Sequence, residues 1–221
     1  MKSTVLITGA NRGVGLALAE HYFDEDYRVI GVCRQSSDAL DRVADQVIES
    51  TDVTQTDDVI SLAETLKGQS LDLLINNAGL LRDESLGSLD FDSIREQMEI
   101  NAYAPLRVAE ALLPLLKQGS KIANITSRMG SIADNDSGGR YGYRASKAAL
   151  NAFGKSLAMD LKPRGIAVAQ LHPGYVQTRM VNFGGFISPQ DAALGIAARI
   201  EELTLDNSGG FWHSNGESLP W

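Results

Sequence analysis

Short runs rich in β-branched residues alternate with longer stretches of helical period along the whole chain. The strand candidates are TVLIT (4–8), RVIGVC (28–33), VIES (47–50), LDLLIN (71–76), KIANITS (121–127), IAVAQLH (166–172) and GFWH (210–213). Helices are expected at about 14–25, 38–45, 56–67, 90–117, 140–162 and 189–203. This alternation is typical of a parallel sheet with helices on both faces. We therefore predict an α/β fold built on a doubly wound, parallel, seven-stranded sheet.

The length and composition indicate one domain. The chain has 221 residues, with neither a repeat nor a low-complexity linker, so we expect residues 1–221 to share one core. The net charge of −8 argues against a nucleic-acid or anionic-membrane partner, because no basic cluster offsets it. No apolar run reaches the roughly 18 residues of a membrane helix. Cys33 is the single cysteine and lies in an apolar run, which excludes an internal disulfide and predicts a cytoplasmic protein without a metal site.

A glycine-rich segment follows the first predicted strand. TGANRGVG (8–15) has glycines at 9, 13 and 15, between a strand and a helix. Such glycines permit a tight turn and let a pyrophosphate approach the backbone N–H groups at the helix start. The alternative is a purely structural turn. The position favours a Rossmann-like dinucleotide site.

Two arginines bear on which dinucleotide is bound. At the end of the second strand, where an NAD site normally carries an acid for the ribose 2′-hydroxyl, this chain has Arg34, and the nearest acid, Asp38, comes later. Arg12 lies inside the glycine turn. Guanidinium groups pair with phosphate through forked hydrogen bonds. We predict that NADP(H) is preferred over NAD(H); the alternative is that both arginines are solvated surface residues.

The stretch GRYGYRASKAAL (139–150) has two tyrosines, of which only Tyr143 has a lysine four residues later. On a helix, Tyr143 and Lys147 share a face, whereas Tyr141 has Ala145 at the same spacing. A neighbouring cation favours phenolate, so this pairing predicts a lowered tyrosine pKa and a proton donor. The alternative is a chance pair on a solvated helix face.

These motifs, taken in order, resemble those of the classical short-chain dehydrogenases/reductases. The matching segments are TGANRGVG (8–15), DV (52–53), NNAG (76–79), Asn101 in EINAYAP, NITS (124–127), YRASK (143–147) and HPGYVQT (172–178). They span nearly the whole chain. The short length, the MGSIADNDSGG insertion and the C-terminal GFWHSNGESLPW resemble the C-factor-like and sniffer-like carbonyl reductases.

The resemblance implies four catalytic residues. Tyr143 would be the general acid that protonates the substrate carbonyl oxygen. Lys147 would hold the nicotinamide ribose, Asn101 would position a water for proton relay, and Ser127 would hydrogen-bond the substrate oxygen. Ser131 fits the family's usual spacing to the tyrosine better, but Ser127 ends a predicted strand as in the family motif, so we assign Ser127.

The resemblance also implies the cofactor contacts. They are Gly9, Asn11, Arg12, Gly13, Val14, Gly15, Arg34, Asp52, Val53, Asn77, Ala78, Gly79, Tyr143, Lys147, Pro173, Gly174, Val176 and Thr178. In the family pattern, Asp52 and Val53 flank the adenine, and residues 173–178 line the nicotinamide.

The expected activity is NADPH-dependent reduction of a small-molecule ketone, aldehyde or quinone to an alcohol. Only about ten residues, RMVNFGGFIS, separate Thr178 from the next predicted helix, which suggests an open substrate site with a short mobile lid. Two alternatives stay open: a dinucleotide-binding signalling protein with incidental turnover, and a 3-ketoacyl-thioester reductase. The long segments 90–117 and 140–162 resemble helices that pair in family dimers, so we expect a homodimer; the alternative is a monomer.

Overall fold

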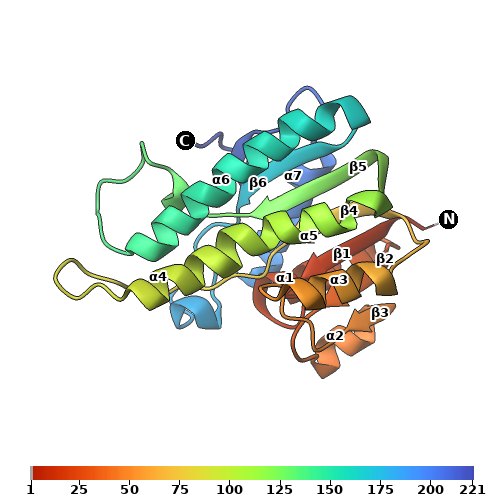
Figure 1. The fold of residues 1–221 in the computed structure, drawn as a ribbon, viewed down its shortest axis with the longest axis horizontal. Coiled ribbons are helices and arrows are strands. Elements are labelled where there is room, and N and C mark those ends of the chain that lie inside the picture. The colour runs from red at the N-terminus through yellow and green to blue at the C-terminus, as the bar shows by residue number, and fades with distance from the viewer. Residues whose placement is uncertain (1) are drawn as a thin grey trace.

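The computed structural model describes residues 2–221 and contains one seven-stranded sheet. The strands are β1 (Thr4–Thr8), β2 (Arg28–Val32), β3 (Gln46–Ile48), β4 (Leu71–Asn76), β5 (Leu116–Ile125), β6 (Ala167–His172) and β7 (Phe211–His213). They pair in the order β3-β2-β1-β4-β5-β6-β7, and every pairing is parallel (Figure 1). The predicted doubly wound α/β fold is therefore confirmed.

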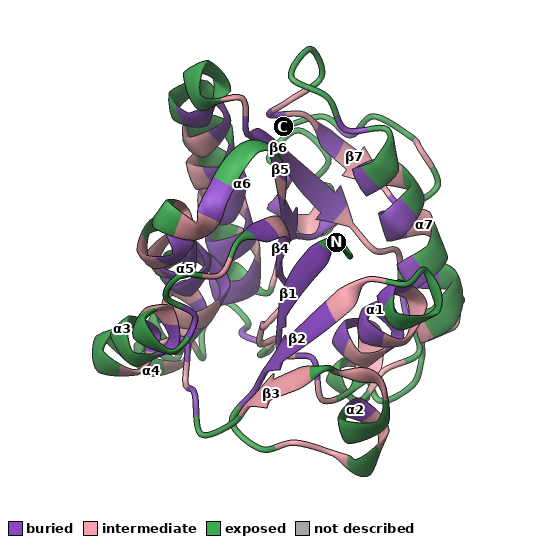
Figure 2. Ribbon diagram, turned by 90° about the vertical axis from the view of Figure 1, so that its right-hand side faces the viewer, coloured by how far each residue is buried: buried purple, intermediate pink, exposed green. Residues whose placement is uncertain are grey.

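Helices cover both faces of the sheet. They are α1 (Gly13–Asp24), α2 (Asp38–Val43), α3 (Thr56–Thr65), α4 (Phe91–Met98), α5 (Ala104–Leu112), α6 (Tyr141–Leu161) and α7 (Pro189–Glu201). Helices α1, α2 and α7 lie on one face, and α3, α4, α5 and α6 lie on the other (Figure 2). Two separate apolar clusters, one on each face, bury both sides of the central strands. This double burial explains why all five residues of β1 are buried and why its three central residues, Val5, Leu6 and Ile7, are apolar without alternation.

Short polar side chains begin several of these helices. The Ser188 hydroxyl accepts a hydrogen bond from the Asp191 N–H at 3.0 Å, with Pro189 at the first helical position, as the sequence predicts for α7. Asp90 caps α4 and Ser37 caps α2 in the same way. None of the described helices is both long and apolar enough to cross a lipid bilayer.

The predicted helix over 90–117 is wrong as a single element. It divides into α4, a π-helical turn over Glu99–Tyr103, α5 and a 3₁₀ turn over Leu113–Leu115. Residues from Leu116 onward belong to β5, which begins five residues before the predicted strand. The interruptions coincide with Pro105 and Pro114, which have no N–H to donate. Strand β5 ends at Ile125, two residues earlier than predicted.

A row of amide side chains crosses the centre of the sheet. The Asn76 Nδ2 on β4 donates to Asn124 Oδ1 on β5 at 2.9 Å, and Asn124 Nδ2 donates to Gln170 Oε1 on β6 at 3.1 Å. All three side chains are at most 2% exposed. Gly154 on α6 leaves room for them, because a Cβ there would lie 1.9 Å from Gln170 Oε1. The row ties three neighbouring strands together beneath the helix that carries Tyr143.

Candidate active site

A cleft of about 1780 Å³ lies along the carboxyl ends of the strands. Its walls come from the segments that follow the strands β1 to β6. The strand order reverses between β1 and β4, and ligands of doubly wound sheets bind at such a switch point. The volume exceeds the range of roughly 300–1,000 Å³ typical of pockets for single small ligands. The cleft can therefore hold a dinucleotide together with a second molecule.

The glycine-rich turn has the geometry that the sequence predicts. Gly9 and Gly13 have φ values of +67° and +58°, which favour glycine. A Cβ on Gly15 would lie 2.3 Å from the Gly9 carbonyl oxygen, so this glycine permits the close contact between turn and helix. The Asn77 Nδ2 donates to the carbonyls of Thr8 and Gly9 at 3.0 and 3.2 Å. Asn77 therefore holds the turn against the end of β4.

Arg12 and Arg34 both line one end of the cleft, and both are exposed. Neither guanidinium has a hydrogen-bond or ion-pair partner among residues 2–221. Between them, Asn11 Nδ2 donates to the Gln35 carbonyl at 2.8 Å, and Ser37 Oγ donates to the Asn11 carbonyl at 2.9 Å. These bonds fix the backbones that carry the two arginines. Two free cations over a glycine turn fit the phosphates of a dinucleotide.

Tyr143 and Lys147 lie at the opposite end of the cleft, with Ser127. The Lys147 Nζ lies 5.9 Å from the centre of the Tyr143 ring and donates to the Ile125 carbonyl at 2.8 Å. Both side chains line the cleft, yet only 8% of Tyr143 and 4% of Lys147 is exposed. The structure thus brings the three predicted side chains together at the ends of β5 and α6.

The predicted lowering of the Tyr143 pKa is wrong for the structure as it stands. Burial raises the pKa of this phenol, although a hydrogen bond with Ser127 and the charge of Arg140 act in the opposite direction. Burial also lowers the pKa of Lys147 from 10.5 to about 7. A lysine with this pKa is only partly charged at neutral pH, so it acts weakly on the phenol. The helical spacing identifies the pair but contains no information about its desolvation.

The two candidate serines occupy different environments. Ser127 lines the cleft, follows β5 and accepts a hydrogen bond from the Met129 N–H at 3.1 Å. Ser131 is 2% exposed and does not line the cleft. Its hydroxyl donates to the Trp221 carbonyl at 3.0 Å and accepts from the Asp134 N–H at 3.1 Å. Ser131 therefore ties the C-terminal segment to the loop before α6, and the geometry favours Ser127 at the reaction centre.

Asn101 lies in the π-helical turn and does not line the cleft. Its amide holds the Leu80 peptide on both sides: Nδ2 donates to the Leu80 carbonyl at 2.7 Å, and Oδ1 accepts from the Leu80 N–H at 2.8 Å. Nδ2 also contacts Ser146 Oγ at 3.0 Å, and Ser146 Oγ donates to the Tyr143 carbonyl. This side chain connects the loop after β4 to the tyrosine helix.

Glu84 is a buried residue at the site that the sequence reasoning missed. It is 4% exposed and accepts hydrogen bonds from Gly142 N–H at 3.1 Å and Ser93 Oγ at 2.9 Å, with Gln97 Nε2 also in contact. Helix α6 has no side-chain cap of its own, since Arg140 precedes it in a left-handed conformation. Glu84 thus supplies a negatively charged cap one residue before Tyr143. Its partners are distant in sequence, so no local pattern could have indicated it.

His172 is a second missed residue of the cleft. It is the last residue of β6, lines the cleft and packs edge-on against His213, with ring centres 4.8 Å apart. Burial, with the nearby His213 and Arg128, lowers the pKa of His172 to about 3. The ring is therefore neutral at physiological pH and forms an uncharged wall beside Pro173.

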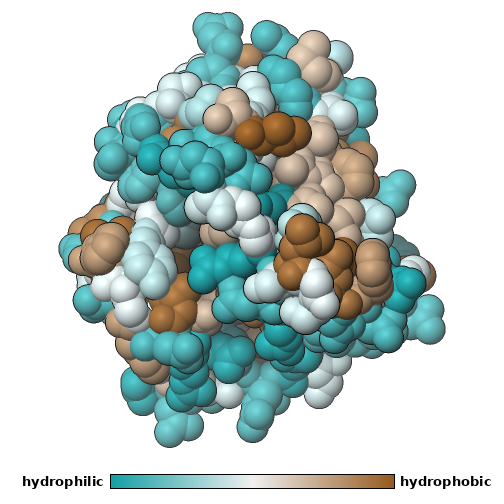
Figure 3. Space-filling view, turned by 90° about the vertical axis from the view of Figure 1, so that its left-hand side faces the viewer, coloured by the Kyte–Doolittle hydropathy of each residue, from teal (hydrophilic) through white to brown (hydrophobic). Residues whose placement is uncertain are grey.

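The segment after β6 forms a short lid. Pro173, Gly174, Val176 and Thr178 line the cleft, followed by a 3₁₀ turn over Arg179–Val181. A Cβ on Gly13 would lie 3.5 Å from Thr178 Cγ2, so the residue just before the lid touches the glycine turn. Met180 and Phe183 line the cleft, whereas Phe186 does not and is 85% exposed. Apolar side chains gather in patches on the face that carries the start of α6 (Figure 3).

Most of the predicted site residues come together in this cleft. Those that line it are Gly9, Asn11, Arg12, Gly13, Val14, Arg34, Asp52, Val53, Asn77, Ala78, Gly79, Ser127, Tyr143, Lys147, Pro173, Gly174, Val176 and Thr178. Gly15 and Asn101 lie behind the wall and support it. Within residues 2–221, no group of three or more histidine, cysteine or acidic side chains is arranged to hold a metal ion.

Comparison with known proteins identifies relatives of this chain. Residues 3–184 match the family model described as short chain dehydrogenase. The 1-hydroxy-2-glutathionyl-2-methyl-3-butene dehydrogenase of Rhodococcus sp. (strain AD45) is 42% identical over 99% of this chain and 100% of its own length. The C-signal protein of Myxococcus xanthus is 43% identical over 68% of this chain and 93% of its own length.

A comparison with solved structures points to the same family as these sequence relatives. The NADPH-bound carbonyl reductase from chicken fatty liver superimposes with a TM-score of 0.88 and 29% identity, covering 100% of both chains. The resemblance inferred from the ordered motifs, including the likeness to C-factor and carbonyl reductases, is therefore confirmed.

Proposed function

Because the chain belongs to the short-chain dehydrogenase family, we propose that it is an NADPH-dependent reductase that converts a ketone, aldehyde or quinone to an alcohol. The observation that carries the proposal is the meeting of Ser127, Tyr143 and Lys147 at one end of the cleft, opposite the glycine turn and its arginines. An oxidoreductase of this family needs both ends: one binds a nicotinamide dinucleotide, and the other protonates the product oxygen.

The bound dinucleotide would supply the hydride to the carbonyl carbon. Tyr143 would donate its phenolic proton to the carbonyl oxygen as negative charge develops there. The Ser127 hydroxyl, which contacts this phenol, would donate a hydrogen bond to the same oxygen and fix its position. Because burial holds Tyr143 protonated at neutral pH, the residue starts the reduction in the form that the reaction requires.

Lys147 and Asn101 support a route for replacing the proton. The ammonium form of Lys147 has three N–H donors, of which the Ile125 carbonyl takes one at 2.8 Å. The remaining donors would hold the nicotinamide ribose and a water. Pro105 has no N–H to donate to the Asn101 carbonyl four residues earlier, so this carbonyl is suited to bind that water. Because both ends of the Asn101 amide are hydrogen-bonded to the Leu80 backbone, this side chain positions neighbouring groups and does not itself react.

The preference for NADPH is proposed from Arg12 and Arg34. Both guanidinium groups line the cleft without a protein partner, and planar guanidinium groups suit a 2′-phosphate. Arg34 lies just after β2, where an NAD site normally carries an acidic residue. The solved carbonyl reductase with NADPH supports the same preference by analogy.

Glutathione-conjugated alcohols and aldehydes form a second candidate substrate class. The relative from Rhodococcus is a dehydrogenase of such a conjugate and matches this chain over nearly its full length. The open mouth of the cleft would accept a small reacting group while the bulk of a conjugate lay outside. The signalling role and the 3-ketoacyl-thioester reductase remain alternatives that the same experiment separates.

The test is NADPH consumption with a panel of diketones, quinones, aldehydes, a glutathione-conjugated aldehyde and a β-ketoacyl thioester. NADH in place of NADPH tests the cofactor preference. Tyr143→Phe should lower kcat by about 10²- to 10⁴-fold, whereas Tyr141→Phe, two positions earlier and 40% exposed, should not. NADPH binding without turnover of any compound would overturn the reductase proposal and favour the signalling alternative.

A further inference from the structure

Arginines without a partner collect at the cleft. Among residues 2–221, most arginine side chains have a hydrogen-bond or ion-pair partner, as in Arg28, Arg107 and Arg199. The guanidinium groups without one belong to Arg12, Arg34, Arg42 and Arg179. Three of these line the cleft, and only Arg42, on α2, does not.

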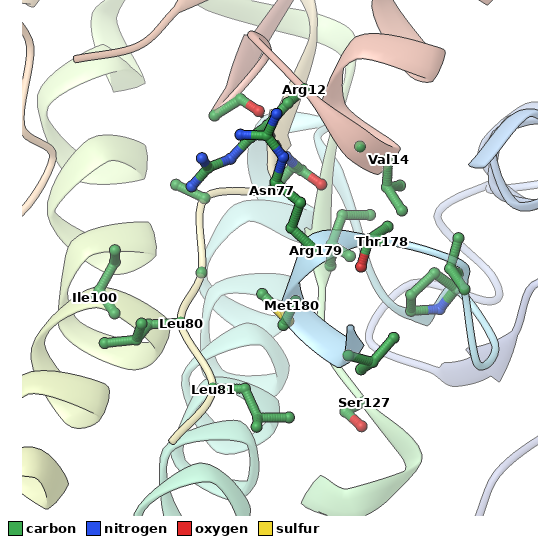
Figure 4. Close-up of a pocket in the computed structure, with 18 of the residues that line it drawn as sticks. Arg12, Val14, Asn77, Leu80, Leu81, Ile100, Ser127, Thr178, Arg179 and Met180 are labelled. Carbon is green, nitrogen blue, oxygen red and sulfur yellow. Dashed lines mark hydrogen bonds between the residues drawn. The ribbon is translucent and has the colours of Figure 1, made fainter. Parts of the chain in front are cut away.

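Arg179 reaches this end of the cleft from the lid. It follows Thr178, whose methyl group lies beside Gly13, and Arg12 precedes Gly13. The contact between Gly13 and Thr178 therefore brings the backbones of Arg12 and Arg179 close together. In Figure 4 the Arg179 side chain extends from the lid toward Arg12 and away from Ser127. The substrate end and the Arg179 guanidinium thus lie on opposite sides of the lid.

Two guanidinium groups held at the same end of a cleft repel, and an anion bound between them relieves this repulsion. No carboxylate of residues 2–221 lies within ion-pair distance of either group. Phosphate oxygens match the planar fork of a guanidinium and accept from two such groups at once. The chemistry of the arrangement therefore selects a phosphate.

We propose that Arg179 and Arg12 form a two-sided phosphate site, in which the lid and the glycine turn grip one phosphate of the bound dinucleotide. This inference rests on the proposed function. It assigns Arg179 to cofactor binding rather than to substrate recognition. It also makes the lid part of the cofactor site.

The test is a titration of the protein with NADPH and NADH, followed by cofactor fluorescence without any substrate. Arg179→Ala should raise the Kd for NADPH about 10- to 100-fold, the range expected for loss of a charged hydrogen bond. Arg42→Ala, which also removes an exposed arginine without a partner, should leave the Kd unchanged. Arg179→Lys should restore part of the affinity.

Comparison of the two cofactors identifies the phosphate. A loss restricted to NADPH assigns the site to the 2′-phosphate, and an equal loss for NADH assigns it to the pyrophosphate. Wild-type affinity of Arg179→Ala for both cofactors would overturn the inference. Because the titration requires no turnover, this outcome is distinct from a failure of the proposed reductase activity.

Discussion

Replacing Lys147 with methionine should stabilise the protein at neutral pH while removing its activity. The native state buries this ammonium group and lowers its pKa from 10.5 to about 7. Methionine has a similar length, carries no charge and adapts to irregular apolar surroundings. The variant therefore avoids the cost of desolvating a cation, which is greatest below pH 7 and declines as the pH approaches 10.5.

The pH dependence gives the magnitude. Because the folded-state pKa lies below the unfolded-state pKa, the native state binds fewer protons between pH 7 and pH 10.5, and wild-type stability rises with pH in this window. One pH unit well inside the window corresponds to about 1.36 kcal/mol. Allowing for partial protonation at pH 7, the contribution of Lys147 should become more favourable by roughly 2 kcal/mol between pH 7 and pH 9.

Urea unfolding of both proteins at pH 7 and pH 9, free of dinucleotide and followed by tryptophan fluorescence, measures this difference. Loss of the hydrogen bond to the Ile125 carbonyl affects the variant at both pH values, so it cancels from the change with pH. The stability advantage of Lys147→Met over wild type should shrink by roughly 2 kcal/mol between pH 7 and pH 9. A difference that is the same at both pH values would refute the reasoning, because it would mean that Lys147 is not desolvated.

Two further pairs of substitutions test the site. Ser127→Ala should lower kcat by about 10²-fold or more with little change in stability. Ser131→Ala should instead lower the free energy of unfolding by about 1–3 kcal/mol and leave kcat nearly unchanged, because the hydrogen bonds of Ser131 hold the C-terminal segment. The reverse pattern would mean that the two serines have exchanged roles. Glu84→Ala should cost about 3 kcal/mol in urea unfolding, because it leaves the donors of Gly142, Ser93 and Gln97 without their acceptor. Glu96→Ala, which removes an exposed acid 3.7 Å from Arg82, should cost less than about 1 kcal/mol; equal losses would contradict the capping role of Glu84.

The sequence predicted well what depends on local pattern. Strand β1, the glycine turn after it and the capped start of α7 are each specified by residues within a few positions, and the structure confirms their secondary structure. The helical spacing of Tyr143 and Lys147 likewise needs only one turn of helix. Seven alternating strands then leave few arrangements for the sheet, because parallel strands need crossover connections.

Features that depend on contacts between distant segments could not be predicted in this way. Glu84 caps a helix that begins 57 positions later in the chain, and Ser131 bonds a residue 90 positions away. The direction of the Tyr143 pKa shift depends on how completely α6 is covered by other segments. The spacing of Tyr143 and Lys147 in the sequence gives no information about this coverage. The broken helix over 90–117 shows a related limit. Pro105 and Pro114 mark where regular hydrogen bonding stops, but the prolines alone do not predict that a helix continues after the first and a strand begins soon after the second.

The amide row across β4, β5 and β6 has a consequence for how the chain finds its native pairing. A slip of two residues between parallel strands keeps every side chain on its original face, so burial of apolar groups alone barely penalises it. In the native register Asn76 lies opposite Asn124, and Asn124 lies opposite Gln170. Any such slip would leave buried amides without partners and cost about 1–3 kcal/mol for each. Three uncharged side chains thus favour the native strand register, because a shifted register that a purely aliphatic centre would tolerate is destabilised here.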